Sequence, residues 1–514
     1  SAKIAQIRKM VDRGLYFTIN RARQYGKTTT LNLLHKNLAP DYICLKMSFE
    51  GIGDSPFDSQ EAFCGMFMRH VQDALQISSA SEDTAYIASW VDTAVTDFAS
   101  LSRHLNKMCK GRKLVLMIDE VDKTSNNRVY IHFLGMLRDK YLARNDGRVF
   151  TFQSVILAGV YDIKNLKLKL INEGVYTPAA TEGKMYNSPW NIAAEFEVDM
   201  SFKSDEIATM LTDYEGDYHT GMDIPAVSRE IYDYTSGYPF LVSRICQIID
   251  EKFDRDWTHG GIQRTVKYLI SQERNTLFDD IFKNLEMYPD LYQMIYDILV
   301  SGIERKYSSD DPVVNWALMF SFVRQFGERI IIANRIFEVR ITNYFISKDS
   351  RKHGPDKKEV NGVFKYDVVR DGKFDMELCL TKFAQHYRKI FTKKDAAFLE
   401  RHGRLVFLSF LTPLINGEGF YYIESETTDA QRMDLVVGFG KQEFIIELKI
   451  WRGQEYHKAG YAQLADYLRS RNAKEGYLLT FDFRKEHTPA AGEPKEQWKT
   501  LDDRDELRVF DIML

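Results

Sequence analysis

Charged residues in two apolar segments near the end of the chain have types and spacing that suit metal chemistry. Asp434 begins the segment Asp-Leu-Val-Val, and Glu447 and Lys449 belong to Ile-Ile-Glu-Leu-Lys at 445–449. Side chains alternate along a strand, so Glu447 and Lys449 would project from one face while apolar residues cover the other. Two carboxylates beside an ammonium can coordinate a hard divalent cation and activate water against a phosphodiester.

The neighbouring elements must bring these residues together. Gly438-Phe439-Gly440 lets the first segment turn back antiparallel against the second. A helix that precedes both carries Glu400, a candidate to complete a metal shell. A helix that follows carries Gln463 and Tyr467, which are four residues apart and therefore share one face. A strand at 476–481 closes the unit, and the predicted order is α-β-β-β-α-β.

Each of these residues also has an ordinary structural explanation. Glu-x-Lys in an apolar strand is often a solvated edge, Glu400 could be plain helix-surface charge, and Gln463 and Tyr467 could pack together without chemistry. Their occurrence in this order favours a nuclease-type site. The catalytic candidates are Asp434, Glu447, Lys449, Gln463, Tyr467 and Glu400, with Asp434 and Glu447 as metal ligands.

A second phosphate-handling pattern lies near the start of the chain. An apolar strand at 14–20 leads into a loop that ends in Gly26-Lys27-Thr28, and a helix follows. This context makes a phosphate-binding loop credible, with the β-phosphate at the helix N-terminus. Lys27 would reach the β- and γ-phosphates, and the Thr28 hydroxyl would hold Mg²⁺. Arg21 stands where the usual loop has its first glycine, so a plain basic loop before a helix is the alternative.

Two further apolar segments support nucleotide binding. Residues 114–118 read as a central parallel strand buried on both faces, and they end in Asp119-Glu120. Asp119 could hold Mg²⁺ through water, and Glu120 could polarise the attacking water as the catalytic residue. A third strand at 155–160 ends at Tyr161-Asp162, where a γ-phosphate sensor could sit. We therefore predict ATP and Mg²⁺ as cofactors. The nucleotide-binding candidates are Gln24, Tyr25, Gly26, Lys27, Thr28, Thr29, Asp119 and Arg244, with Thr28 and Asp119 as metal ligands.

The middle of the chain is mainly helical. Ser204-Asp205-Glu206 has the composition of a helix start, and Gly237-Tyr238-Pro239 marks a break before a helix that carries Arg244. Behind a phosphate loop, a lid helix commonly carries a basic sensor, and Arg244 is that candidate. Residues 329–340 read as a hairpin-like β segment after helices, which suggests a winged-helix-like module. It either contacts DNA or only packs against the ATPase.

Composition limits the class of protein. The chain has 514 residues with 44% hydrophobic content, too long for one core. A net charge of −4 gives no global basic surface, so any nucleic-acid surface must be local. The five cysteines form no Cys-x-x-Cys pair, which fits a reducing cytoplasm. Without a membrane-length apolar stretch or a signal-peptide pattern, we expect a soluble cytoplasmic protein with no membrane partner.

The motifs resemble two known families. Residues 23–31, 118–122 and 237–239 resemble predicted AAA-type ATPases related to archaeal and STAND P-loop ATPases. The C-terminal part resembles the PD-(D/E)XK nuclease superfamily through Asp434 and Glu447-x-Lys449, and Gln463-x-x-x-Tyr467 is similar to its RecB-like members. Met433 stands where the motif usually has proline. The tandem resembles multidomain ATPases of Bacteroides-type bacteria, and it implies a Mg²⁺-dependent nuclease fold coupled to a nucleotide switch.

The predicted fold class is α/β. We expect a P-loop ATPase core with a parallel sheet, a helical lid, a winged-helix-like module, a linker, and a C-terminal α/β restriction-endonuclease-like domain. Their predicted ranges are 1–190, 191–284, 285–346, 347–370 and 371–514.

The predicted function is an ATP-binding and ATP-hydrolysing, metal-dependent nuclease that acts on nucleic acid, with DNA favoured over RNA and with Mn²⁺ as a substitute for Mg²⁺. The alternative is a non-catalytic STAND-like nucleotide switch whose C-terminal domain only binds nucleic acid or a partner. A DNA translocase with a degenerate nuclease is a third reading. A homo-oligomer that completes the nucleotide site with a neighbour's arginine stays open, with Arg138, Arg144 and Arg148 as unranked candidates.

Overall fold

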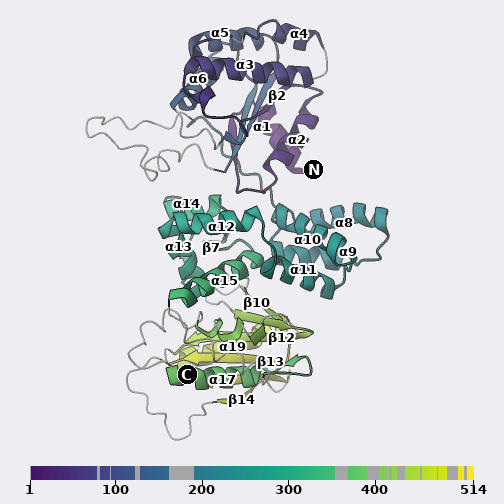
Figure 1. Cartoon of the computed structure of the whole chain (residues 1–514), viewed down its shortest axis with the longest axis vertical. Coiled ribbons are helices and arrows are strands. Elements are labelled where there is room, and N and C mark those ends of the chain that lie inside the picture. Colours follow the sequence, from purple (N-terminus) through teal and green to yellow (C-terminus); the bar gives the residue numbers. More distant parts are fainter. Residues whose placement is uncertain are drawn as a thin grey trace, which may run out of the picture. The chain divides into compact units, whose positions relative to one another are not determined.

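The computed structural model divides the chain into two compact units (Figure 1). The first unit is Ser1–Phe202 with Tyr238–Phe240 and Met319–Ser321, and the second holds the remainder. The described residues are 2–77, 81–92, 94–121, 128–160, 190–301, 303–352, 368–390, 406–408, 410–412, 414–415, 419–424, 434–451, 454–471, 473–482, 496–502 and 506–514.

The first unit is built on a parallel sheet, as predicted. Its strands lie in the order β1-β4-β3-β2, and all three pairings are parallel. Every residue of β3 and β4 is buried, as expected for strands covered on both faces. The strands are β1 (Phe17–Asn20), β2 (Ile43–Ser48), β3 (Leu114–Asp119) and β4 (Ser154–Gly159).

Helices cover both faces of this sheet. Alternate residues of β3 point to opposite sides, so Leu116 joins one apolar cluster and Val115 the other. The Val115 side packs against α1 (Ala2–Asp12) and α2 (Lys27–Leu38). The other side packs against η1 (Ser55–Phe57), α3 (Gln60–Ile77), α4 (Glu82–Ala88), α5 (Phe98–Met108) and α6 (Arg128–Asn145).

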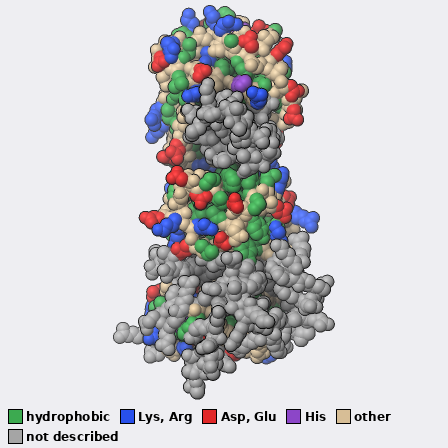
Figure 2. All heavy atoms as spheres, turned by 90° about the vertical axis from the view of Figure 1, so that its left-hand side faces the viewer, with side chains coloured by type: hydrophobic (Ala, Val, Ile, Leu, Met, Phe, Trp, Pro, Cys, Tyr) green, Lys and Arg blue, Asp and Glu red, His purple; other side chains and the backbone are tan. Residues whose placement is uncertain are grey.

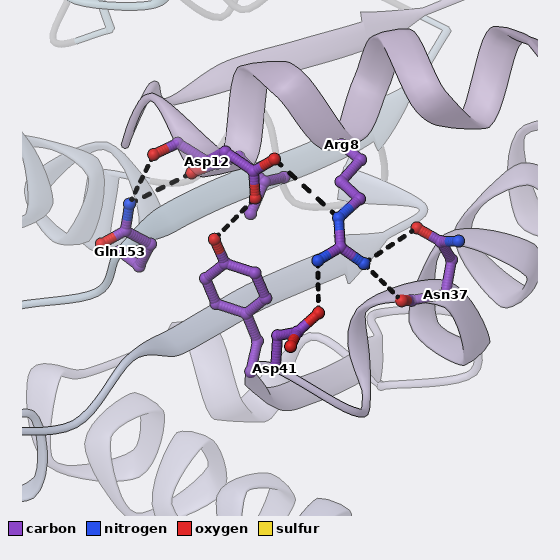
Figure 3. Close-up of polar contacts among 7 residues, drawn as sticks. Arg8, Asp12, Asn37, Asp41 and Gln153 are labelled. Carbon is purple, nitrogen blue, oxygen red and sulfur yellow. Dashed lines mark hydrogen bonds and ion pairs between the residues drawn. The ribbon is translucent and has the colours of Figure 1, made fainter.

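Hydrogen bonds and an ion pair connect α1 to the end of α2 and to the segment before β4 (Figure 3). The Arg8 guanidinium donates to the backbone carbonyl of Asn37 at 2.9 Å and pairs with Asp41. The Gln153 amide donates to the carbonyl of Asp12 at 3.3 Å. Because α2 begins in the Gly-Lys-Thr loop, these contacts help to fix the helix that carries that loop.

The helices after residue 203 begin where the sequence patterns predict. α8 begins at Ser204, where the Glu206 carboxylate accepts the backbone N–H of Lys203 at 2.9 Å. α10 begins at Pro239, directly after the predicted break. The helices are α8 (Ser204–Tyr218), α9 (Ile224–Thr235), α10 (Pro239–Lys252), α11 (His259–Ser271), α12 (Thr276–Met287), α13 (Pro289–Tyr296), η4 (Asp297–Ser301) and α14 (Pro312–Met319).

A three-stranded sheet follows, and here the predicted hairpin over 329–340 is wrong in its second half. β5 (Arg305–Lys306), β7 (Arg329–Ile332) and β6 (Val323–Phe326) lie in the order β5-β7-β6, and Arg335 already begins α15 (Arg335–Lys352). The Asn334 side chain accepts the backbone N–H of Phe337 at 2.9 Å, which caps a helix and ends the strand. The predicted linker at 347–370 therefore includes the last residues of α15 and also β8 (Val369–Arg370).

The helix between β5 and β6 is the apolar α14. α14 contains no Lys or Arg, and the face of the α12–α14 region in Figure 2 gathers mainly hydrophobic side chains. Arg324 and Arg329 flank the ring of Phe326 at the β6–β7 turn, with guanidinium carbons 5.8 and 5.7 Å from its centre. Both predicted roles of this module, DNA contact and packing against the ATPase, stay predictions.

The C-terminal part of the second unit contains a six-stranded mixed sheet in the order β10-β11-β12-β13-β15-β14. β10 to β12 pair antiparallel, and β13 pairs parallel with both β12 and β15. The last two strands of this sheet, β14 and β15, were not predicted from the sequence. The elements are β9 (Lys373–Phe374), α17 (Met376–Ile390), β10 (Gly419–Glu424), β11 (Asp434–Phe439), β12 (Gln442–Ile450), α19 (Gln454–Ser470), β13 (Glu475–Phe481), β14 (Glu496–Asp502) and β15 (Leu507–Met513).

The described helices include none that is both long enough and apolar enough to span a membrane.

Candidate nucleotide and nuclease-type sites

The Gly-Lys-Thr loop closes around its own lysine. Gly26 caps α2 in the left-handed region, with φ 77° and ψ 18°, a conformation that glycine adopts without strain. The Lys27 ammonium donates to the carbonyls of Arg21 and Ala22, each at 3.0 Å, and the side chain is only 6% exposed. Lys27 therefore spans the loop at the N-terminus of α2. Gln24 and Thr29 are exposed there.

The predicted magnesium ligands Thr28 and Asp119 are brought together. The Thr28 hydroxyl donates to the Asp119 carboxylate at 2.6 Å, and the second carboxylate oxygen accepts the backbone N–H of Glu120 at 3.0 Å. Asp119 ends β3 and is buried, and the half-buried Glu120 has φ 55°. A hydroxyl and a carboxylate at hydrogen-bond distance are hard oxygen ligands, so the donor set fits Mg²⁺ beside a bound phosphate.

Aromatic residues support the loop, which the sequence analysis did not foresee. The rings of Tyr25 and Tyr238 meet edge to face with centres 4.7 Å apart. The Tyr238 hydroxyl donates to the Arg23 carbonyl at 2.8 Å. Burial raises the pKa of Tyr25 to about 12. The Gly-Tyr-Pro pattern was the available signal, but it could not show which loop Tyr238 contacts.

Arg244, the predicted nucleotide sensor, contacts two other side chains. Its guanidinium pairs with the buried Glu273 at 2.8 Å and donates to Gln247 at 2.7 Å, and the bond to Glu273 raises the pKa of Arg244. A nucleotide-sensing role for Arg244 stays a prediction. The other predicted sensor, Tyr161-Asp162, lies outside the described residues.

One of the three arginines predicted to complete a neighbour's site is committed to its own fold. The Arg144 guanidinium donates to the carbonyls of Phe152, Gln153 and Gly14 at 2.7, 2.8 and 2.6 Å. An arginine that holds three carbonyls this closely would have to break them to reach another subunit.

In the C-terminal sheet, Lys449 lies between two of its predicted neighbours. Its ammonium donates to the Gln463 side-chain oxygen at 3.1 Å and is 3.8 Å from the Glu447 carboxylate. The side chains of Glu447 and Lys449 are 3% and 8% exposed. A Cβ added at Gly460 would lie 3.1–3.2 Å from the Lys449 side chain, so a glycine lets α19 approach β12 this closely.

The sheet register places Asp434 opposite Glu447, as a shared metal site requires. Leu435 pairs with Ile446, so one step further along the same antiparallel register sets Asp434 opposite Glu447. Across the other edge of β11, Asp434 pairs with Glu424. Three acidic residues therefore lie in one row across β10, β11 and β12. Glu424 was not among the sequence candidates, although an acidic residue at the end of an apolar strand was a usable signal.

Glu400 and the side chains of Asp434 and Glu424 lie outside the described residues. Within the described part of the chain, no group of three or more His, Cys, Asp and Glu side chains is arranged to hold a metal ion. Tyr467 is buried on the same helix as Gln463, with the Arg471 guanidinium 5.6 Å from its ring centre.

Comparisons with known proteins agree with this division. The family model of the AAA-like domain matches residues 2–259, half of the chain. The chain belongs to this family. The C-terminal part of this AAA-like protein, residues 419–490, matches the PD-(D/E)XK nuclease superfamily, and that match covers the strands of Asp434 and Glu447. The predicted resemblances to AAA-type ATPases and to the PD-(D/E)XK nuclease superfamily are therefore both confirmed.

Several solved structures are similar to this AAA-like protein. A Walker-type ATPase of Pyrococcus abyssi is 12% identical, with a TM-score of 0.43 over 66% of this chain and 95% of its own. The ORC2 protein of Aeropyrum pernix in ADPNP–ADP complexes is 12% identical, with a TM-score of 0.31 over 66% and 93%. The ORC1 protein of Aeropyrum pernix in complex with DNA is 9% identical, with a TM-score of 0.30 over 68% and 93%. No curated protein sequence matches this chain.

Proposed function

We propose that this AAA-like protein binds and hydrolyses ATP, and that its PD-(D/E)XK domain is a metal-dependent nuclease under nucleotide control. The observation that carries the nuclease proposal is the buried Lys449 between Glu447 and Gln463. Removing an ammonium and a carboxylate from water costs several kcal/mol per ion, and well-packed apolar residues would often be as stable. A buried ion pair beside a row of acidic strand positions is therefore better explained by chemistry than by packing.

In the nuclease-type site, Asp434 and Glu447 would hold Mg²⁺ or Mn²⁺, and Glu400 could complete the shell. Such an ion, when bound, supplies Lewis-acid polarisation of the phosphodiester and lowers the pKa of bound water. Lys449 would orient that water or stabilise the negative charge that develops on the phosphate. Gln463 holds the Lys449 ammonium in place.

In the nucleotide site, the arrangement supports ATP hydrolysis by Glu120. Lys27 would exchange its two loop carbonyls for β- and γ-phosphate oxygens. Thr28 and Asp119, which touch each other at 2.6 Å, would hold Mg²⁺. Glu120 follows Asp119 directly and would polarise the attacking water.

Nucleic acid is the proposed substrate, with DNA favoured over RNA. The proposal is tested by incubating the full chain with supercoiled plasmid and with labelled single-stranded DNA and RNA, with Mg²⁺ or Mn²⁺, in the presence and absence of ATP. Glu447→Ala should abolish cutting. Glu443→Ala is the matched control, because Glu443 lies on the same strand with a side chain 47% exposed. Lys27→Ala should abolish any effect of ATP on cutting.

The outcomes separate the two predicted classes of function. Cutting that needs Glu447 and responds to ATP through Lys27 would establish the coupled nuclease. Intact ATP binding with no cutting under any condition would make the C-terminal domain a binding module. The protein would then be a nucleotide switch.

A further inference from the structure

A buried polar cluster lies beneath α19, and neither proposed activity uses it. Three donors converge on one carboxylate oxygen of Asp511, which is 6% exposed on β15. Lys499 of β14 donates to it at 2.6 Å, the Tyr461 hydroxyl also donates to it, and the His457 ring nitrogen Nε2 is 3.4 Å away. Lys499 also donates to the Tyr461 hydroxyl at 2.6 Å. The cluster therefore joins α19 to the two strands that the sequence analysis missed.

The same helix holds the lysine of the nuclease-type site on its other flank. At about 100° per residue, Tyr461 and Gln463 project about 200° apart around α19. Gln463 accepts from Lys449 at 3.1 Å, and Gly460 packs directly against the Lys449 side chain. Any rotation of α19 about its axis would move Gln463 relative to Lys449.

A path of neighbouring side chains connects the two flanks. Thr480 of β13 pairs with Lys449 in the parallel register, so the two side chains share a face of the sheet. The Thr480 hydroxyl is fully buried and lies 3.5 Å from Nδ1 of His457. His457 in turn contacts Tyr461 at 3.0 Å and Asp511.

The cluster is suited to fixing the orientation of α19. Apolar contacts such as those of Leu464 and Leu468 resist lifting of the helix but are not directional. Hydrogen bonds are directional, so a rotation of α19 would break the bonds that His457 and Tyr461 make to Asp511. Burial alone would raise the pKa of the Asp511 carboxyl, but hydrogen bonds from His457, Lys499 and Tyr461 outweigh it and lower the pKa. Asp511 therefore remains charged and holds its donors at neutral pH.

We propose that Asp511, with His457, Tyr461 and Lys499, forms a positioning cluster that fixes α19 so that Gly460 and Gln463 hold Lys449 in its working geometry. These residues act through Lys449 and do not touch the substrate. The kinetic part of this inference rests on the proposed nuclease function. The placement of Lys449 can be measured without it.

The test uses Tyr461→Phe in the full chain, because this change removes one hydroxyl and keeps the ring. The matched control is Tyr477→Phe. Tyr477 is a buried tyrosine of β13 that points to the opposite face of the same sheet, where it packs on Trp498 and Phe510. Both variants are compared with the parent chain by single-turnover cleavage and by reductive methylation of Lys449, followed by mass spectrometry. The exposed Lys441 serves as an internal standard.

We expect Tyr461→Phe to lower the cleavage rate by about 10- to 100-fold with little change in KM, since misplacing a reacting group by about 1 Å costs rates of that order. Lys449 should become severalfold more reactive towards methylation, while Tyr477→Phe changes neither quantity. Local loosening of α19 explains both effects.

Lys449 labelling decides the inference in every case. If labelling of Tyr461→Phe equals that of Tyr477→Phe, the cluster does not position Lys449 and the inference is overturned. If the parent chain cuts nothing, the proposed nuclease function fails by itself. Increased labelling in Tyr461→Phe would still support the positioning cluster, and unchanged labelling would still overturn it.

Discussion

The two candidate sites of this AAA-like protein hold their lysines by different means. Lys27 is held by backbone carbonyls five and six residues away in its own loop. Lys449 is held by a side chain of a separate helix, fourteen residues further along the chain. The first arrangement depends on local backbone geometry, and the second depends on how α19 packs on the sheet. A short sequence motif determines the local geometry, whereas the packing of a helix depends on residues that are far apart in the sequence.

The strongest test of this comparison is Lys449→Met. The variant keeps the length of the side chain and removes the charge. We expect cleavage to fall by about 10²- to 10³-fold, as when one preorganised donor to a developing charge is lost. Single-turnover assays on labelled DNA with Mn²⁺ would measure it, and Lys441→Met in the β11–β12 turn is the control. ATP affinity should not change. A parallel loss of ATP affinity would show that the two sites are not independent.

The matching change in the other site is Lys27→Met. Lys27 loses its contacts to the loop and its proposed contacts to phosphate, and hydrogen bonds to charged groups are worth about 1.5–3 kcal/mol each. We expect ATP to bind on the order of 100-fold more weakly. Titration with a fluorescent ATP analogue measures this affinity. Lys36→Met, an exposed lysine on the same helix, should bind ATP as the parent chain does. If both variants weakened ATP binding equally, Lys27 would not belong to the phosphate site.

The strand, the Gly-Lys-Thr loop and the Thr28–Asp119 contact could be predicted because they follow strong local rules. The β-strand, the left-handed Gly26 and the helix start are adjacent in sequence, and β3 is a continuous apolar run that ends in Asp119. Thr28 follows β1 and Asp119 ends β3, so their contact can form once β1 and β3 join one parallel sheet. What the motif could not supply was Tyr238, because its contact to the loop spans 215 residues.

The nuclease-type site was predicted less completely. The strands of Asp434 and Glu447 and the face shared by Gln463 and Tyr467 follow from periodicity. Gly460 and Asp511 could not be found, since their importance lies in contacts between elements. β14 and β15 were missed, although Val509, Phe510 and Ile512 gave an apolar signal. The hairpin at 329–340 failed because β-branched residues in α15 read as strand, and the Asn334 cap outweighed that local preference.

Gly460→Ala tests whether the close packing of α19 on β12 positions Lys449. The added methyl group would lie 3.1–3.2 Å from Lys449, so Lys449 or α19 must shift by a few tenths of an ångström. We expect cleavage to fall by about tenfold through misplacement of the ammonium. Gly216→Ala in α8 is the matched control, because its Cβ meets nothing within 4 Å. There the substitution should leave cleavage unchanged. Full cleavage by Gly460→Ala would mean that Lys449 tolerates a looser setting than the structure suggests.

The smallest expected effect is on stability, through Asp511→Asn. Breaking a fully buried ion pair costs roughly 3–5 kcal/mol, but the Lys499 side chain is 33% exposed and water offsets part of the loss. We expect a loss of about 1 kcal/mol at pH 7. The folded-state pKa of Asp511 is lowered, so its contribution is present above the ordinary carboxyl pKa of about 4 and lost as the pH falls through the folded value.

The melting temperatures of the parent chain and Asp511→Asn should therefore differ most between about pH 5 and 8 and should converge only as the pH falls below about 4. Differential scanning fluorimetry across this range measures the trend. If the difference in melting temperature instead grew as the pH fell, Asp511 would be protonated in the folded protein. The three donors would then surround a neutral carboxyl, and charge would not be what fixes α19. Convergence would instead show that the packing that holds Lys449 depends on an electrostatic contact, whereas Lys27 is held by the backbone of its own loop.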